Sequence, residues 1–520
     1  MSTPRLTMRL AIVLATAVAG GAAGTRIAGQ AEPPIAIVLR KVPAGAAHAA
    51  FEESLPAVSR FYDSRGFSPA WTTAAGWSAA GDSVLRVLRK AAEDGLNPEE
   101  YDFPAFAGAA ATRDADALAR LDVLMSLAVV RYARDLGWGV TLPSEVDSDN
   151  AYDERPFTAD TVLEKVASAA DPGTALTGFA PPGVAYPLVK EGLARLRAVQ
   201  ARGGWSTVSA GPTLRLGDRG PRVQELRALL IERGDLSADS PVSETFDPNL
   251  VAALEQFQER TGLEPDGVYG PKVVSELNVP LATRIQQVRL GLERLRWLPP
   301  SPSGRRVGVN LADFKAYVFE GDQVIFETRT VVGKEFHETP MFSKLMTYIV
   351  INPYWNVPPS IARREILPKV KEDPGYLARN HMEMNGSSIR QLPGSWNSLG
   401  RFKFMFPNHY NIYMHDTPAR AAFARADRTG SHGCIRLEKP AELAALLLGP
   451  QGWTPERIAA AVATGEQTVV PLKTPIPVYI SYVTAFLGPD GLMHYRRDVY
   501  GRDKNLLDAL ARRGQGAWEK

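Results

Sequence analysis

Hydrophobic residues between positions 47 and 200 recur at the spacing of amphipathic helices. Val84 and Leu88 lie four positions apart, as residues on one helical face do, and a longer series of this kind runs from Leu118 to Leu136. Few β-branched runs interrupt these series. We therefore predict that this part of the chain is helical.

A second helical unit is expected at residues 213–279, after the break at Gly203 and Gly204. Two short apolar faces recur at helical spacing, and residues 265–267 have the composition of a tight turn. These faces consist of Val223, Leu226, Leu229 and Leu230, and of Leu250, Leu254 and Phe257.

The pattern changes after Pro299 and Pro300 to short runs rich in β-branched and aromatic residues, which favour strands. These runs are residues 307–311, 316–319, 324–332 and 347–351. Two later runs, 478–480 and 493–495, flank a glycine-rich turn, and we expect them to form a hairpin that returns to the same sheet. The prediction is a multidomain α+β chain whose β-rich domain covers residues 305–500.

Residues 361–408 interrupt this β-rich domain. They contain Pro368, Pro374, Pro393 and several glycines, which are too many breakers for one regular element. Long ordered loops in compact domains often cover an active site. We expect a lid or capping insertion here.

The amino terminus has the three parts of a secretory signal peptide. Arg5 and Arg9 precede an apolar stretch at residues 10–24, and small residues follow it. The stretch is shorter than the ~20 residues that span a bilayer. We predict an exported protein with a cleaved signal at residues 1–31 and no stable membrane span, while an uncleaved anchor remains the alternative.

Composition narrows the choice of function. The chain has 520 residues, 45% of them hydrophobic and 22% charged, which is typical of a soluble protein of two to four domains. Its formal net charge of +2 predicts no particular attraction to nucleic acid.

Cys434 is the single cysteine of the chain, so it has no intramolecular disulfide partner. A thiol titrates at about pH 8.5 and needs a base to become a nucleophile at neutral pH. His432 is two positions away on the same segment and has little freedom to turn inward, whereas His415 comes from a separate predicted strand. We assign His415 as the base and His432 as a structural or substrate-contacting group.

The residues around Cys434 fit acyl transfer. Gly433 permits positive φ and close approach of a ligand, so amides near Gly433 and Cys434 are candidates for holding an oxyanion. Asp416 follows His415 directly and should point to the opposite face. A backbone carbonyl, near Ser431 or His432, is the alternative partner for the imidazole.

The cysteine has two other interpretations. A lone cysteine is often a small buried hydrophobe. Zinc binding by His409, His415, His432 and Cys434 is the second alternative, but no CxxC or HExxH spacing supports it, and no metal or other cofactor is expected.

The segment from His415 to Ser431-His432-Gly433-Cys434-Ile435-Arg436 resembles the signature of the L,D-transpeptidases with a YkuD-type catalytic domain. The resemblance implies Cys434 as nucleophile, His415 as general base and acid, and the turn from Ser431 to Gly433 as their support. It also implies a thioester intermediate, a donor tetrapeptide and an acceptor stem of peptidoglycan, and 3→3 cross-links. Carbapenems are expected to acylate Cys434.

The flanking regions resemble the larger, YcbB-like members of this family. Residues 47–200 are similar to their helical scaffold, residues 213–279 to a three-helix peptidoglycan-binding module, and residues 361–408 to a capping subdomain. The resemblance places the protein in the periplasm or cell wall. The residues expected to contact substrate are Asn352, Tyr354, Trp355, Tyr413 and Arg436, with Arg401 and Lys403 as further candidates.

Alternative functions remain open at this point. An L,D-carboxypeptidase, or an amidase that releases proteins from the wall, would use the same site and differ only in what resolves the thioester. A non-catalytic peptidoglycan-binding protein is the third possibility. For the module at residues 213–279, the alternative to wall attachment is a helical spacer without affinity for peptidoglycan.

Overall fold

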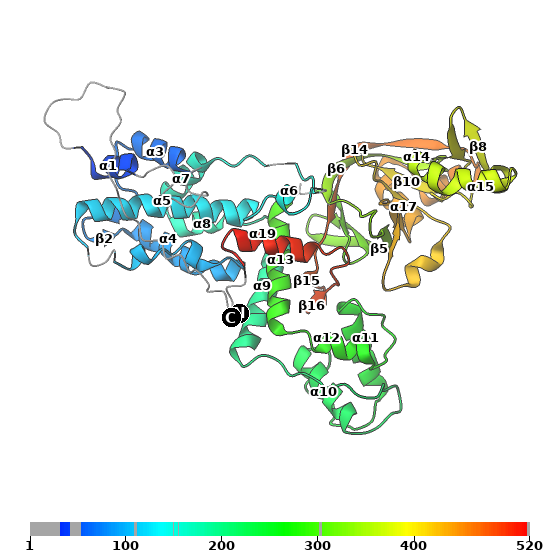
Figure 1. Ribbon diagram of the computed structural model, residues 1–520, viewed down its shortest axis with the longest axis horizontal. Coiled ribbons are helices and arrows are strands. Elements are labelled where there is room, and N and C mark those ends of the chain that lie inside the picture. Colours follow the sequence, from blue (N-terminus) through cyan, green and yellow to red (C-terminus); the bar gives the residue numbers. More distant parts are fainter. Residues whose placement is uncertain are drawn as a thin grey trace, which may run out of the picture. The chain divides into compact units, whose positions relative to one another are not determined.

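The computed structural model describes residues 32–41, 54–108, 112–148, 150–153, 155–300 and 304–516 (Figure 1). The predicted signal peptide, residues 1–31, lies outside them. Within the described ranges, no helix has the length and apolar character that a membrane span requires. The described residues form two compact units: the first contains those within 1–140, 155–181 and 513–518, and the second contains those within 141–154 and 182–512.

The first unit is helical, as the sequence predicts. The 24-residue helix α5 (Ala115–Trp138) packs against α1 (Pro34–Lys41), α3 (Leu55–Ser64), α4 (Ala79–Arg89), α7 (Ala159–Ala167) and α8 (Pro172–Thr177). Three 3-10 turns follow α4, at Ala91–Asp94, Pro98–Glu100 and Pro104–Gly108, and a small ribbon joins β1 (Thr72–Thr73) to β2 (Gly76–Trp77).

A buried carboxylate organises the centre of this unit. The Asp122 side chain is fully buried in α5 and accepts hydrogen bonds from the Tyr62 hydroxyl at 2.6 Å and from the Trp71 amide at 2.9 Å. The amides of Ala70 and Thr72 and the Thr72 hydroxyl also donate to it, at 2.7 to 2.9 Å. Five donors therefore hold the loop before α4 against α5.

The second unit contains the predicted three-helix module. Its helices are α10 (Pro221–Arg233), α11 (Pro248–Arg260) and α12 (Pro271–Leu277), and they enclose one apolar core. Gln258 links α11 to the turn before α12, because its side chain donates to the Asp266 carboxylate at 2.7 Å and accepts from the Gly267 amide at 2.9 Å. Gly267 has φ +63°, a value that favours glycine.

A large mixed sheet forms the catalytic part of the second unit. Its strands are β3 (Arg305–Asn310), β4 (Lys315–Glu320), β5 (Gln323–Gly333), β6 (Phe342–Ile351), β10 (Phe402–Met405), β11 (Met414–His415), β12 (Thr429–Ser431), β13 (Ile435–Leu437) and β14 (Thr468–Ser481). They lie in the order β12-β5-β13-β11-β10-β6-β14-β3-β4, and β4 also pairs with β5, so the sheet closes on itself.

Helices complete the second unit. They are α6 (Pro143–Val146), α9 (Ala185–Ala201), α13 (Leu281–Trp297), α17 (Pro440–Leu448), α18 (Pro455–Ala463), α19 (Arg502–Arg512) and a 3-10 turn at Gly449–Gln451. Another 3-10 turn, Arg420–Ala424, lies between β11 and β12. Helices α9 and α13 pack along each other.

The expected hairpin has a different partner from the predicted one. Residues 478–480 belong to β14 and pair with β3 and β6, whereas β16 (Met493–Tyr495) pairs with β15 (Ala485–Leu487). This two-stranded ribbon packs on α9 and α13 and does not return to the large sheet. The sequence pattern could not identify the partner strand, because both strands have similar composition.

The insertion is more regular than its many prolines and glycines predicted. It contains α14 (Pro359–Ile361), a π-helical turn (Ala362–Ile366), α15 (Leu367–Glu372) and α16 (Tyr376–Arg379). Strands β7 (Trp355–Asn356), β8 (Met382–Asn385) and β9 (Ser388–Gln391) form a small sheet, and Val357, Ile366 and Ile389 form a core of their own. We call these residues, 355–391, the cap.

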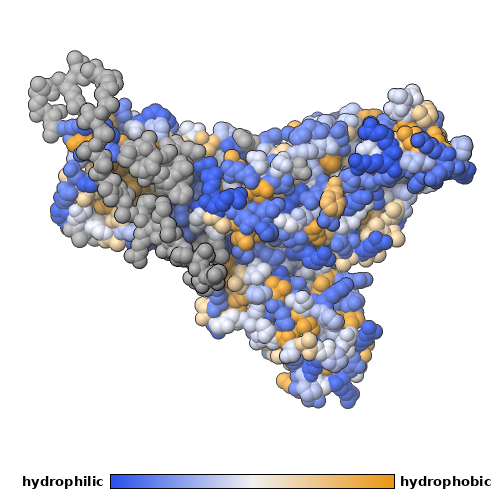
Figure 2. Space-filling view, in the orientation of Figure 1, coloured by the Kyte–Doolittle hydropathy of each residue, from blue (hydrophilic) through white to orange (hydrophobic). Residues whose placement is uncertain are grey.

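The limits of the cap differ from the predicted range of 361–408. The cap begins earlier, at β7, and residues 402–405 form β10 inside the large sheet. Figure 2 shows hydrophobic residues among hydrophilic ones where Figure 1 labels β8 and α15, and Leu367 and Met384 are exposed apolar residues of these elements.

The five donors around Asp122 make a stability prediction. Replacing Asp122 with alanine leaves buried amides and hydroxyls without an acceptor, so we expect the free energy of unfolding to fall by about 3 kcal/mol or more. Asp122→Asn retains part of the acceptor capacity and should lose less. Chemical denaturation measures both, and equal stability of wild type and Asp122→Ala would contradict the role given to this carboxylate.

Candidate functional site

The site lies where two short parallel strands meet. In the register of β11 and β13, Met414 faces Ile435 and His415 faces Arg436. The Ile435 amide donates to the Tyr413 carbonyl at 3.1 Å, which places Cys434 beside Tyr413 just before the paired residues. Alternate residues of a strand share a face, so Cys434 and His415 are diagonal neighbours on one face.

The opposite face of these strands is the hydrophobic core. Met414, Ile435 and Phe404 are completely buried there. The reactive residues consequently alternate with core residues along each strand. This alternation determines which side chains point away from the core. They include Tyr413, His415, Cys434 and Arg436.

Cys434 is a partly buried free thiol. Its Sγ lies 3.8 Å from the Asn411 carbonyl oxygen, and it shares a hydrogen bond with the Tyr413 hydroxyl. Burial raises the pKa of the Cys434 thiol above its ordinary value, against the opposing effect of Tyr413 and the positive charge of Lys403. The thiol therefore remains protonated at neutral pH.

His415 is buried, and one ring nitrogen is already bonded. Its Nδ1 lies 2.5 Å from the Asp416 carbonyl oxygen, and since a carbonyl only accepts, Nδ1 carries the proton and Nε2 is left as the basic atom. Burial, together with the charges of Arg436 and Lys403, lowers the pKa of His415 to about 3, against the opposing effect of the hydrogen bond with Asp416. The imidazole is neutral at physiological pH and can accept a proton.

The expected turn does not orient the imidazole. The carbonyl comes from Asp416 and not from Ser431 or His432. The Asp416 carboxylate turns away, as its position after His415 predicted, and accepts from the amides of Arg401 and Thr417, both at 2.7 Å. The sequence thus indicated a carbonyl partner but named the wrong residue, because it does not reveal the bend after β11.

The turn before Cys434 is rigidly supported. Gly433 has φ +104°, a conformation that side chains other than glycine rarely adopt. The Ser431 hydroxyl donates to the Cys434 carbonyl at 2.5 Å and accepts from the Gly433 amide at 3.1 Å. Thr339, fully buried, donates to the Gly433 carbonyl at 2.8 Å. Thr339 was absent from the sequence prediction, and no nearby motif signals it.

His432 points to the cap instead of the thiol. Its Nε2 lies 2.8 Å from Oε1 of Glu365 in the π-helical turn, and its ring lies 5.2 Å from that of His337, centroid to centroid. Sequence reasoning missed Glu365 and His337, which are 67 and 95 positions away from His432. The contact between His432 and Glu365 connects the turn before Cys434 to the cap.

Two cations lie in the same row as His415. The register pairs Lys403 with His415 and His415 with Arg436 across three adjacent strands. The Lys403 ammonium lies 3.9 Å from the centroid of the Tyr413 ring. Within the described part of the chain, Nε of Arg436 is buried without a hydrogen-bond partner. This row can attract a carboxylate.

The other predicted contact residues are distributed differently. Trp355 packs against the cap core, and the Tyr354 ring lies 4.6 Å from the guanidinium of Arg390 in the cap. Asn352 is fully buried, and its amide donates to carbonyls of Ala461, Val462 and Glu466 at 3.0 to 3.2 Å. The structure does not bring Asn352 to the face that bears Cys434.

A metal-binding arrangement is not found in the described ranges, where no three His, Cys, Asp or Glu side chains are close enough to share an ion. His409, one of the four ligands considered, stacks on Tyr410 with 3.8 Å between ring centroids.

Comparison with known protein families agrees with this geometry. Residues 304–480 match the L,D-transpeptidase catalytic domain, residues 56–193 a scaffold domain, and residues 219–277 a family described as "Putative peptidoglycan binding domain". These matches confirm the resemblance identified from the sequence, and the predicted fold class is confirmed with it: a helical amino-terminal region, a helical binding module and a β-rich catalytic domain.

One curated relative is the "Putative L,D-transpeptidase" of Haemophilus influenzae, 31% identical over 241 residues. The aligned region is 42% of this chain and 49% of the relative, so the chain spans about half the length of the relative it matches.

Solved L,D-transpeptidase structures are also similar. One from Xylanimonas cellulosilytica is 14% identical, with a TM-score of 0.18, and covers 52% of this chain and 99% of its own. One from Stackebrandtia nassauensis is 15% identical, with a TM-score of 0.23, and covers 52% and 97%.

The raised pKa of Cys434 predicts how the thiol reacts with iodoacetamide, which alkylates only the thiolate. Because the thiolate fraction grows tenfold per pH unit below the pKa, the alkylation rate should rise steadily from pH 6 to pH 9 without a plateau. Mass spectrometry of timed samples measures the rate. A rate that is already constant at pH 6 would indicate a thiolate–imidazolium pair instead.

The contact between His432 and Glu365 predicts the mobility of the cap. Glu365→Ala removes the only side-chain bond described between His432 and the cap, so amide hydrogen exchange of residues 359–372 should accelerate. Glu372→Ala is the matched control, because it removes an exposed glutamate from the same insertion. Identical exchange in both variants would show that this contact does not hold the cap.

Proposed function

We propose that this protein is a peptidoglycan L,D-transpeptidase that forms 3→3 cross-links through a thioester on Cys434. The observation that carries the proposal is the pair of Cys434 and a neutral, carbonyl-bound His415 on the same face of two paired strands, in a domain that matches the L,D-transpeptidase family. Thiol catalysis needs a base within reach of the thiol, and the pairing of β11 with β13 brings the segments of His415 and Cys434 side by side.

The first step acylates the thiol. Nε2 of His415 removes the proton from Sγ as Sγ attacks the carbonyl at the L-centre of meso-diaminopimelate in a tetrapeptide stem. The C–N bond to the terminal D-alanine then breaks, and the imidazolium returns its proton to the departing amine. The low pKa of His415 suits this second role, because a weak base is a strong proton donor once it is charged.

The oxyanion of this step needs two donors. The Gly433 amide is already bonded to the Ser431 hydroxyl, so it is a poorer candidate than the Cys434 amide, which has no acceptor among the described residues. Burial raises the pKa of Tyr413, and its hydroxyl therefore stays protonated. We assign the Cys434 amide and the Tyr413 hydroxyl to the oxyanion.

The row of cations beside His415 binds the donor stem. Lys403 and Arg436 flank the imidazole, and Nε of Arg436 is unpaired within the described chain. Stem peptides carry free carboxylates, and an unpaired buried guanidinium is a strong partner for one. Tyr354 and Trp355 contact the acyl chain from the cap side.

The second step resolves the thioester. The side-chain amine of a second stem attacks the acyl carbon, His415 takes the proton of that amine, and the thiol is released. Water in place of the amine would give L,D-carboxypeptidase activity. The cap, connected to the motif through His432 and Glu365, restricts the entry of water.

The remaining domains serve the attachment to the wall. The peptidoglycan-binding module and the scaffold keep the catalytic domain on its polymeric substrate. The protein acts outside the cytoplasm, in the periplasm or cell wall, after export by the amino-terminal signal. No cofactor takes part in either step.

Purified protein incubated with disaccharide tetrapeptide tests this proposal. We expect a 3→3 dimer that has lost one D-alanine, detected by mass spectrometry, and a covalent adduct of a carbapenem on Cys434. Formation of a tripeptide without dimer would show that water, and not an amine, resolves the thioester. Unchanged substrate together with retention of the protein on insoluble peptidoglycan would favour a binding protein.

Two variants identify the reacting groups. Cys434→Ala should form neither dimer nor carbapenem adduct, and His415→Gln should lower the acylation rate by about 10²- to 10⁴-fold. His494→Gln is the matched histidine control, since His494 lies in β16, which pairs with β15 outside the large sheet that carries the site. An adduct on Cys434→Ala would show that another residue attacks.

A further inference from the structure

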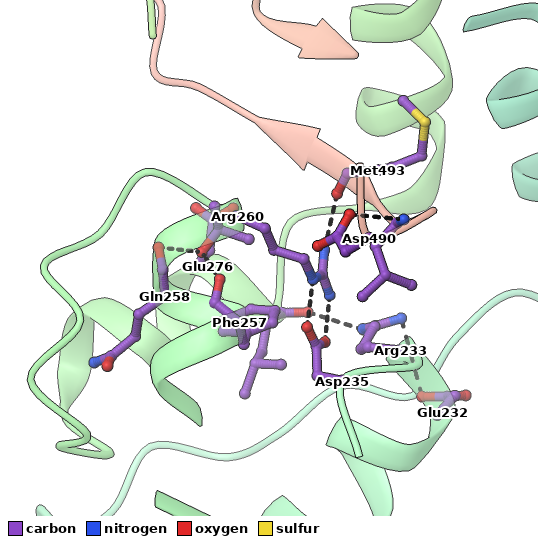
Figure 3. Close-up of polar contacts among 12 residues, drawn as sticks. Glu232, Arg233, Asp235, Phe257, Gln258, Arg260, Glu276, Asp490 and Met493 are labelled. Carbon is purple, nitrogen blue, oxygen red and sulfur yellow. Dashed lines mark hydrogen bonds and ion pairs between the residues drawn. The ribbon is translucent and has the colours of Figure 1, made fainter. Parts of the chain in front are cut away.

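Buried charged residues join the end of α11 to the catalytic domain, and Figure 3 shows the part of this connection in which Arg260 contacts Asp235 and Met493. The Arg260 guanidinium pairs with Asp235 inside the module and donates to the Met493 carbonyl at 3.1 Å. Arg496 donates to the Arg260 carbonyl at 2.8 Å and pairs with Asp313 at 2.5 Å. Since Asp313 lies between β3 and β4, the module is fixed against the large sheet at this point.

A cavity of about 130 Å³ lies beside this junction. The module contributes Glu259 and residues 262–265, at the end of α11, and the catalytic domain contributes residues 312–315, Arg329, residues 424–428, Arg496, Arg497 and Val499. None of the residues assigned above to the reaction lines it. The cavity is therefore separate from the row of Lys403, His415 and Arg436.

Arg428 is the unusual member of this lining. Its Nη atoms donate to the carbonyls of Arg425 at 2.7 Å and Phe314 at 3.4 Å, and its Nε is buried without a partner among the described residues. Within those residues no carboxylate forms an ion pair with it. Burial lowers the pKa of Arg428, and the charge of Arg329 lowers it further. A desolvated guanidinium without a counter-ion favours an anionic ligand.

The wall that belongs to the catalytic domain has an excess of positive charge. Besides Arg428 it includes Lys315, Arg329, Arg425 and Arg497. Of its two acids, Asp313 is already paired with Arg496, and Asp427 lies 3.7 Å from Arg497. The Arg425 side chain forms no hydrogen bond or ion pair within the described chain, so its charge is available.

We infer that this cavity binds a carboxylate of a stem peptide, at a position along the wall polymer other than the stem that reacts at Cys434. The inference rests on the proposed function, which makes peptidoglycan the substrate. A rigid junction suits such a site because it holds the module and the catalytic domain at one spacing, so a strand bound at the cavity is presented to Cys434 in a constant register.

Binding of a soluble strand of disaccharide tetrapeptides to the full chain tests the inference. Every protein in this experiment also carries Cys434→Ala, which prevents turnover. Arg425→Gln combined with Arg497→Gln should weaken binding of a soluble strand of several disaccharide tetrapeptides about tenfold, as expected for the loss of charge-assisted hydrogen bonds. Arg428→Gln, more buried, provides a second variant. Titration calorimetry measures the affinities.

The matched control is Arg86→Gln combined with Arg202→Gln, which removes the same charge from exposed positions outside the cavity. It should bind like the parent. A strand with amidated stem carboxylates should bind the parent and the cavity variant equally. In the Cys434-containing protein, the cavity variants should keep the carbapenem acylation rate, which reports an intact catalytic face.

Three results would overturn the inference. One is equal affinity of the cavity variants and the control, and another is equal loss in both. The third is a difference that persists with glycan strands lacking stems, because the cavity would then recognise another group. Each leaves the proposed function standing if the wild-type chain still produces the 3→3 dimer, whereas absence of any dimer would refute the proposed function itself.

Discussion

The parallel pairing of β11 with β13 is the constraint on which the site depends. Met414 and Ile435 anchor the two strands in the core, and the residues next to them along each strand point to the opposite face. A shift of one residue in either strand would bury its reactive side chain and expose its core residue. The hydrophobic effect acting on a few apolar side chains therefore sets the relative position of the thiol and the imidazole.

Burial also decides the protonation of that pair. It raises the pKa of Cys434 and lowers that of His415, so both groups are neutral at rest. The neighbouring charges of Lys403 and Arg436 stabilise a thiolate but oppose an imidazolium. A neutral pair delays charge separation until an acyl group is present, and the Tyr413 hydroxyl remains beside the sulfur as a fixed dipole.

The sequence revealed the residues of this pair but not all of their partners. Cys434, His415 and Gly433 could be predicted because the chemistry needs those residue types at short spacing. The Asp416 carbonyl, Glu365 and Thr339 could not, because each depends on a bend or a long-range contact that leaves no periodic signal. Likewise, β16 pairs with β15 and not with the large sheet, a choice of partner that the strand pattern does not encode.

The contact that holds the module and the contact that holds the cap differ in kind. The junction at Arg260 is buried: Arg260 donates to the Met493 carbonyl and Arg496 donates to the Arg260 carbonyl, and breaking these bonds would leave buried guanidinium groups without those acceptors. The contact between His432 and Glu365 is half exposed and therefore weak. Several buried hydrogen bonds fix the module while one exposed contact holds the cap, so the cap can open to admit a stem without moving the module from the catalytic sheet.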